Sequence, residues 1–183
     1  MGSSGDLMGQ SDWKEPALQY MEALAARNHS EVIARSEPGL VEAVGREAIR
    51  AWLDLPYSDP ETRVTLLEPK WVSTLGPMTQ GDRRFVQITF ALRIQIELLP
   101  PEGSAHPLEE TRAFYQQVLE ASYGADRVRY SDKRHQFEAE AENLIWGYSD
   151  GSGRWTFVEN REETRDYISK SIPFEILRAF SDH

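Results

Sequence analysis

The chain has 183 residues, of which 40% are hydrophobic and 10% aromatic, and its formal net charge is −10. This apolar content is too high for a disordered protein, and the length fits a single domain. The acidic balance argues against binding to nucleic acids and anionic membranes, and the absence of cysteine excludes thiol catalysis, disulfides and thiolate metal sites.

Residues 1–10 are rich in Gly and Ser and lack the basic and apolar segments of an intact signal peptide, so we expect them to be a disordered tag or linker. Residues 11–183 are expected to form one domain. No window approaches 18 apolar residues, so no membrane span is expected. The sequence therefore predicts a soluble protein, cytoplasmic or exported with a processed N-terminus.

The first sixty residues have helical spacing. Pro16 lies near an expected helix start, and apolar residues then recur on one face: Leu18, Met21, Leu24 and Ala25. A short helix is expected over residues 31–36, and Pro38-Gly39 is expected to interrupt the chain. A further helix is expected over residues 45–55, with Ile49, Trp52 and Leu53 on one face, before the prolines of "PYSDPE" end it.

From residue 62 the apolar residues recur with a period of two. Short strands are expected over residues 62–68 and 70–76, followed by a long one over residues 83–99. In the long strand the apolar side chains expected to face the helices are Val86, Ile88, Phe90, Leu92, Ile94 and Ile96. The side chains expected to face away are Gln87, Arg93, Gln95 and Glu97. This alternation predicts a curved antiparallel sheet with a single buried face.

Residues 100–107 are expected to form a loop, and residues 108–124 a helix whose inward side chains are Leu108, Phe114, Val118 and Leu119. Residues 135–149 return to a period of two, but the apolar positions change from odd to even numbers near residue 143. A strand cannot turn both sets inward without an extra residue, so a β-bulge is expected near Glu142–Asn143. Three alternating carboxylates are expected on the solvent face rather than in a cation site: Glu138, Glu140 and Glu142.

The segment "SDGSG", residues 149–153, is expected to be a hairpin turn. Gly151 and Gly153 supply positive φ angles, and Asp150 can accept a hydrogen bond from its own downstream backbone. A calcium loop needs more oxygen ligands, and a phosphate loop needs a helix after the glycines, whereas a strand is expected here. One or two short helices around Pro173 are expected to end the chain.

This order of elements resembles the cone-shaped α+β fold of the nuclear-transport-factor-2-like superfamily. The similar segments are "ALQYMEALAARNHSEVIARS", "VGREAIRAWL", "LIWGYSDGSGRWTFVEN" and "SIPFEILRAF", and the chain looks closest to bacterial members of undescribed function. The resemblance implies an α+β fold in which N-terminal helices pack on the concave face of a strongly curved antiparallel sheet. Relative to the minimal fold, residues 100–124 are an inserted helical segment.

The resemblance also implies a pocket between the helices and the sheet. Enzymes of the superfamily such as ketosteroid isomerase place an Asp base and Tyr or Asp donors in that cavity, but no Asp of this chain falls at an inward position of an identified strand. Aromatic residues are expected either to line an apolar cavity and bind a ligand or to be plain core, and the candidates are Tyr20, Trp52, Trp71, Phe90, Trp146 and Trp155.

The sequence indicates no catalytic residues. The four histidines, His29, His106, His135 and His183, lie in polar surroundings, and no two of them have the i, i+4 spacing of a helical metal site. No serine lies in a nucleophile elbow. No metal and no cofactor is therefore expected.

Two hypotheses remain open. The first is a non-catalytic module that binds a small apolar ligand or a protein partner, with a homodimer through the sheet as one such assembly. The second is a lyase, isomerase or hydrolase that uses a buried carboxylate or a Tyr as acid or base. The absence of a recognisable catalytic constellation favours the first.

Overall fold

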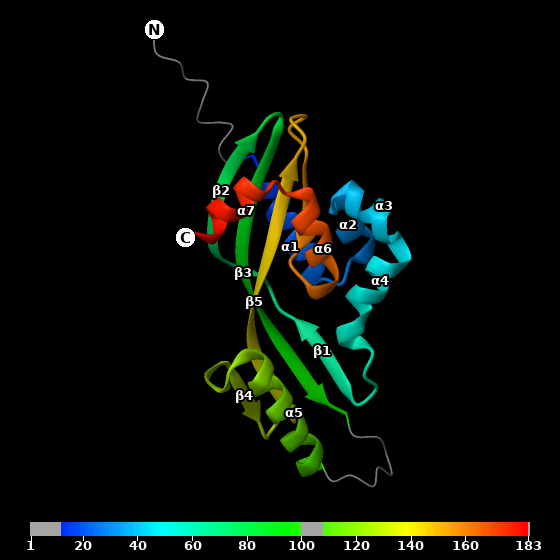
Figure 1. Ribbon diagram of the computed structural model, residues 1–183. Coiled ribbons are helices and arrows are strands. Elements are labelled where there is room, and N and C mark those ends of the chain that lie inside the picture. Colours follow the sequence, from blue (N-terminus) through cyan, green and yellow to red (C-terminus); the bar gives the residue numbers. More distant parts are fainter. Residues whose placement is uncertain (1–11, 100–107, 183) are drawn as a thin grey trace.

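The computed structural model describes residues 12–99 and 108–182. The tag or linker predicted for residues 1–10 and the loop predicted for residues 100–107 lie outside this range, as do His106 and His183. The described chain has an α+β fold with a six-stranded antiparallel sheet that does not close, and it is elongated along the two longest strands (Figure 1). The predicted fold class is confirmed.

The N-terminal part is helical, as expected. Its elements are α1 (Lys14–Ala25), α2 (His29–Arg35), α3 (Pro38–Val44), α4 (Arg46–Asp54) and the 3-10 helix η1 (Leu55–Tyr57). The interruption predicted at Pro38-Gly39 occurs just before these residues, at Ser36 and Glu37, and Pro38 begins α3. A proline is well tolerated at a first helical position, and the Glu37 side chain caps this helix by accepting a hydrogen bond from the Leu40 amide at 3.0 Å.

Two long strands run the length of the molecule. The strands are β1 (Thr62–Leu66), β2 (Lys70–Gln80), β3 (Arg83–Leu98), β4 (Val128–Ser131), β5 (Gln136–Ser149) and β6 (Trp155–Glu159). β3 and β5 pair with each other along their whole length. β2 and β1 pair with the two ends of β3, and β6 and β4 pair with the two ends of β5. The sheet is therefore long in the strand direction and narrow across it.

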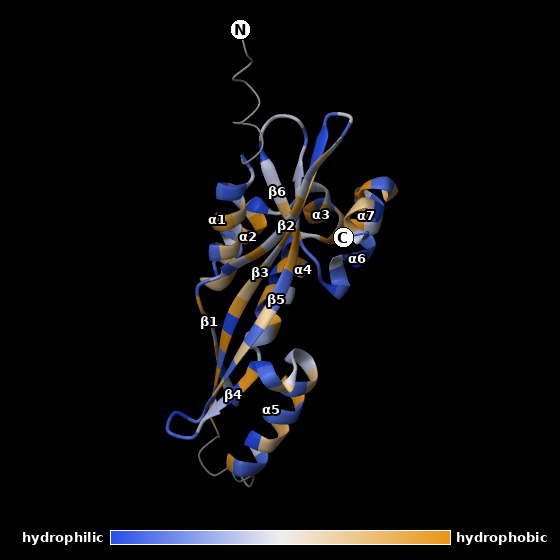
Figure 2. Cartoon of the chain, turned by 90° about the vertical axis from the view of Figure 1, so that its left-hand side faces the viewer, coloured by the Kyte–Doolittle hydropathy of each residue, from blue (hydrophilic) through white to orange (hydrophobic). Residues whose placement is uncertain are grey.

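The remaining helices follow the strands. They are α5 (Leu108–Tyr123), the 3-10 helix η2 (Ala125–Arg127), α6 (Glu162–Ser171) and α7 (Phe174–Ser181). The strand end paired with β2 and β6 is covered by α1 and α2 on one side and by α6 and α7 on the other, whereas α5 packs at the opposite end (Figures 1 and 2). We call that opposite end, residues 62–66, 92–98 and 108–141, the lower lobe.

The face predicted for β3 is confirmed over most of its length. Val86, Ile88 and Phe90 are fully buried in a cluster with α1, and Ile96 is buried in the lower lobe together with Leu119. Further along the same face, Ile94 is half-buried. The inward assignment of the even-numbered residues therefore holds for both halves of the strand.

The prediction of a single buried face is wrong. Phe85 points to the opposite face and is also fully buried, in a cluster with Trp146, Tyr148 and Phe180. The C-terminal helices α6 and α7 lie on this side of the sheet (Figure 2), so the end of the sheet that contains β2 and β6 has a buried apolar cluster on each face. Alternation within β3 cannot reveal this, because the second cover comes from the far end of the chain.

The predicted β-bulge in β5 is wrong for the same reason. The register with β3 is unbroken from Arg84 opposite Ser149 to Glu97 opposite Gln136. The odd-numbered set of β5, with Phe137 and Ile145, is buried on the face covered by α1 and α5. The even-numbered set, with Trp146 and Tyr148, is buried on the face covered by α6 and α7. The apolar positions therefore change from odd to even numbers because different helices cover the two faces, and not because the strand contains an extra residue.

The inward face predicted for α5 is half right. Leu119 is buried and Leu108 packs on the lower-lobe core, but Phe114 is 61% exposed and Val118 43% exposed. The inward stripe instead continues through Tyr115 and Tyr123. Both stripes satisfy helical spacing, and the two tyrosines combine an apolar ring with a hydroxyl that can reach a polar partner at the edge of the core.

The turn predicted at "SDGSG" is confirmed. It joins β5 to β6, and Gly151 and Gly153 have φ angles of 86° and 85°. The Asp150 carboxylate accepts a hydrogen bond from the Ser152 amide at 3.0 Å. The Ser152 hydroxyl, and after it this amide, hold the pKa of Asp150 below its ordinary value. The carboxylate is thus used within the turn.

Candidate functional site

One face of the sheet carries a groove between the helical covers of its two ends. On this face α1 packs over Val86, Ile88 and Phe90, and α5 packs over Ile96 and Leu98. Between the two covers lies a cavity of about 620 Å³, which we call the central groove. Its lining comes from η1, β1, β3, the end of α5, η2, β5 and the segment joining β6 to α6.

The floor of the central groove is aliphatic. Six side chains from three adjacent strands form it: Val64, Leu66, Leu92, Ile94, Ile96 and Ala141. Because register partners in an antiparallel ladder lie on the same face, the pairs Val64–Ile96 and Leu92–Ala141 place these side chains side by side. The floor therefore offers a continuous apolar strip for the body of a ligand.

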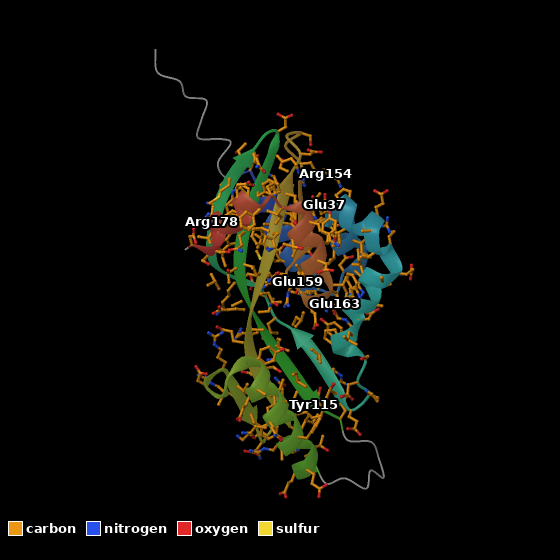
Figure 3. All side chains as sticks on the ribbon, viewed as in Figure 1. Glu37, Tyr115, Arg154, Glu159, Glu163 and Arg178 are labelled. Carbon is orange, nitrogen blue, oxygen red and sulfur yellow. The ribbon has the colours of Figure 1, made fainter. Side chains whose placement is uncertain are left out.

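The wall on the side away from α5 is polar and consists of Glu159, Asn160 and Arg161. Glu159 is the last residue of β6 and lies opposite Ile145, so its side chain is on the same face as Ile145 and Phe157. Figure 3 shows Glu159 and Glu163 midway along the molecule, between the upper helices and the lower lobe. An acidic residue thus occupies an inward position of the sheet, at the edge of the apolar strip.

The Glu159 side chain is only 20% exposed, and its burial raises the pKa of this carboxyl, opposed by Arg161 and reinforced by Glu163. The Arg161 guanidinium lies 3.7 Å from the Glu159 carboxylate and 3.5 Å from that of Glu163, and it also donates a hydrogen bond to the Trp52 carbonyl at 3.3 Å. Arg161 is therefore held by three acceptors.

The backbone beside this wall is also fixed. The Thr164 hydroxyl donates to the carbonyl of Glu159, and the Arg161 amide donates to the Thr164 hydroxyl oxygen at 3.0 Å. The amide of Asn160 donates to the carbonyl of Leu144 at 2.8 Å. These bonds hold the junction of β6 and α6 against β5, so the position of Glu159 is set by backbone contacts.

The opposite wall comes from the end of α5 and from η2. Arg127 lies 3.4 Å from the Glu142 carboxylate, and Ser122 and Tyr123 complete this side of the groove. Burial raises the pKa of the Tyr123 hydroxyl. The two walls therefore each carry an ion pair, and the aliphatic strip lies between them.

A second, much smaller cavity of about 20 Å³ lies behind Glu159. Tyr20, Ser36 and Thr164 contribute to its lining, together with Glu159 itself. The pKa of Tyr20 is raised by burial and further by the charge of Glu159. This cavity is too small for a ligand, but it shows that the carboxyl of Glu159 lies near a buried hydroxyl on α1.

The six aromatic residues predicted to bind a ligand are not brought together. Phe90, Trp146 and Trp155 are buried within the core. Trp71, on β2, is 40% exposed and its ring lies 5.4 Å from that of Trp13. Tyr20 and Trp52 border the small cavity beside Glu159. The central groove is lined by other residues, and ligand binding by the six aromatics stays a prediction.

Sequence reasoning missed Glu159. Only aspartates were expected as inward acids, whereas the last strand, β6, ends in a glutamate. The signal was present in "WTFVE", where Trp155, Phe157 and Glu159 alternate on one face. That face is recognisable as inward only once the pairing of β6 with β5 is known.

Within residues 12–99 and 108–182, no cluster of three or more His, Asp or Glu side chains could hold a metal ion. No helix of this described part combines the length and apolar character needed to cross a membrane. Comparison with protein-family models gives no match, and a search of curated proteins gives none either.

Proposed function

We propose that the protein is a non-catalytic binding module that holds a small amphipathic molecule in the central groove. The observation that carries this proposal is the aliphatic strip of β1, β3 and β5 in a cavity of about 620 Å³, next to polar walls. Ligand sites are commonly cavities of roughly 300–1,000 Å³ with apolar linings and a few polar groups that orient the ligand. The groove has both properties.

We further propose a relationship to the nuclear-transport-factor-2-like superfamily. Its support is the order of the elements, with helices before a curved antiparallel sheet and a cavity on the face that the first helix covers. In this chain the space beneath α1 is filled by core side chains, and the open volume lies further along the same face.

Binding is tested by thermal shift of the intact protein with steroids, fatty acids and aromatic metabolites. A ligand that binds only the folded state raises stability by RT ln(1 + [L]/Kd), so the shift grows with its concentration. Ile94→Phe adds bulk to the middle of the floor and should reduce the shift. Gln95→Phe, at the adjacent position on the opposite face, is the matched control and should retain the full shift. A shift that Ile94→Phe leaves unchanged would place the ligand elsewhere.

A second candidate function is acid–base catalysis by Glu159. The observation that favours it is a carboxyl whose pKa is raised by burial beside an apolar cavity, which is the environment of a general acid or base near neutral pH. Turnover of an epoxide, a ketosteroid or a hydroxy-ketone that Glu159→Gln abolishes and Glu138→Gln, an exposed carboxylate outside the lining of the groove, preserves would establish this function over the binding module.

A homodimer through the sheet stays a prediction. The feature that supports it is the strand β2, which pairs with β3 on one side only among the described strands and exposes Trp71 and Val72. Sedimentation equilibrium of the wild-type protein and of Val72→Lys tests it, because a charge at a strand edge disfavours pairing with a second copy. A monomer at all concentrations would rule it out.

A further inference from the structure

We infer that the ligand of the central groove is an aliphatic amine, whose ammonium group binds Glu159 and whose hydrocarbon body lies on the strip formed by β1, β3 and β5. This inference rests on the proposed binding function and specifies the chemistry of its ligand. Three observations support it: the capacity of Glu159 to accept hydrogen bonds, the ion pairs that already occupy the two arginines of the groove, and the aliphatic floor.

Glu159 has open acceptor capacity. Among the described residues its carboxylate oxygens receive no hydrogen bond, and their nearest cation, in Arg161, is 3.7 Å away. The hydrogen bond from Thr164 goes to the backbone carbonyl of Glu159, so it leaves the carboxylate oxygens free. The side chain is 20% exposed, so the carboxylate can be reached from the groove, and a ligand with N–H donors would give it a charge-assisted hydrogen bond that no described residue provides.

The arginines of the groove are already engaged. Arg161 lies between the carboxylates of Glu159 and Glu163 and donates to the Trp52 carbonyl. On the opposite wall, Arg127 is paired with Glu142. An acidic head group would have to displace one of these carboxylates and would meet the charge of the others. The polar walls therefore favour a positive head group over a negative one.

The groups that face Glu159 come from three elements besides its own strand. They are Arg161 and Glu163 at the start of α6, Tyr20 on α1 and Tyr57 in η1. Burial is the main cause that raises the pKa of both tyrosines, and the charge of Glu159 adds to it. The tyrosines therefore stay neutral at physiological pH and can accept or donate hydrogen bonds. Arg161 is the one permanent cation of this set, and it is shared with Glu163.

The floor determines the body of the ligand. Its six side chains are all aliphatic, and no aromatic ring belongs to it, so the surface offers dispersion contacts along a strip rather than a stacking partner. An alkyl chain or a saturated ring system fits this surface. Combined with the acceptor at one wall, the chemistry indicated is a saturated hydrocarbon body that ends in an amine.

The test compares three probes with the same chain, decylamine, decanol and decanoate, by isothermal titration of the full-length protein. Decylamine should bind most tightly and decanoate least. Glu159→Gln should weaken decylamine binding about tenfold, the scale of one charge-assisted hydrogen bond, and leave decanol within about twofold. Glu138→Gln changes the charge equally on the exposed row, outside the lining of the groove, and should leave all three affinities unchanged. Ile94→Phe adds bulk to the floor and should weaken binding of both decylamine and decanol.

The wild-type protein provides a check that needs no variant. Decylamine stays protonated at acidic and neutral pH, so its affinity should fall as the pH is lowered through the pKa of Glu159, whereas the affinity for decanol should not change. Binding of none of the probes would reject the proposed function itself. Tightest binding of decanoate, or a decylamine affinity that is unaffected by Glu159→Gln and by pH, would overturn the inference and leave the binding function standing.

Discussion

The hydroxyl of Tyr115 donates a hydrogen bond to the carboxylate of Asp59 and so joins α5 to the segment that precedes β1. Figure 3 shows Tyr115 in the lower lobe, where α5 approaches β1. Burial and the neighbouring carboxylate raise the pKa of this hydroxyl, so it remains protonated and able to donate at physiological pH. The contact spans 56 positions of the sequence and ties α5 to the sheet edge.

Replacement of Tyr115 by Phe should therefore loosen α5. We expect a loss of roughly 1–3 kcal/mol in the free energy of unfolding, the range for a hydrogen bond to a charged group, and faster hydrogen exchange in α5 than in α1. Tyr123→Phe is the matched control, because Tyr123 lies on the same face but has no described hydrogen-bond partner. Equal effects of the two variants would mean that the bond to Asp59 adds nothing.

The orientation of α5 gives a second prediction. Leu119→Ala should cost about 2–5 kcal/mol, because a buried leucine loses its contacts and leaves a cavity. Phe114→Ala removes a larger side chain that is 61% exposed, and its cost should stay within about 0.5 kcal/mol. Urea unfolding of both variants measures the difference, and the reverse ranking would show that the helix presents its other face.

The turn between β5 and β6 gives a third prediction. A Cβ atom at Gly151 would lie 2.8 Å from the Asp82 carbonyl oxygen, whereas at Gly153 nothing lies within 4 Å. Both residues have positive φ, so alanine at either should cost about 1–2 kcal/mol. Gly151→Ala should cost more because of the added clash. Melting temperatures of the two variants decide, and a smaller loss at Gly151 would contradict the close approach of residue 82.

The fourth prediction concerns pH. Burial raises the pKa of Glu159 in the folded protein above the unfolded value, so between these two pKa values the folded state binds more protons than the unfolded state. Stability is therefore lost as the pH rises from the ordinary glutamate pKa, about 4.3, through the folded pKa. Glu159→Gln removes this loss and should be more stable than wild type at neutral pH, with Arg161 still held by Glu163.

The difference between the two proteins should disappear at pH values below the ordinary glutamate pKa, where both forms are uncharged at this position. Chemical denaturation at a series of pH values provides the measurement. A variant that is less stable than wild type at neutral pH, with the gap closing on acidification, would mean that attraction to Arg161 outweighs the burial of Glu159.

The local patterns predicted most of the elements. The alternation of Val86, Ile88 and Phe90 was sufficient to place β3 and its inward face, because a strand of that length shows its period within itself. The turn at Asp150–Gly153 was recognisable because a tight turn needs residues with positive φ, and glycine adopts such angles most easily. These features depend on residues close together in the sequence.

The errors concern contacts between distant segments. The apolar phase of β5 changes because α5 and the C-terminal helices cover opposite faces, and nothing near Glu142 records where those helices lie. The inward position of Glu159 became visible only through its pairing with Ile145. The groove itself is a gap between covers, so it is defined by elements that do not meet and has no local sequence signature.

The unbroken pairing of β3 and β5 has a consequence for how the groove adapts to different molecules. Because the hydrogen-bonded ladder continues beneath it without a bulge, a sharp kink of the floor would break backbone hydrogen bonds. The width of the groove therefore changes most readily through a shift of α5 or of the side chains of the walls. Selectivity for the thickness of a ligand is thus set by the floor, and adaptation to its length by the partly exposed side chains of the wall opposite Glu159, such as those of Arg127 and Glu142.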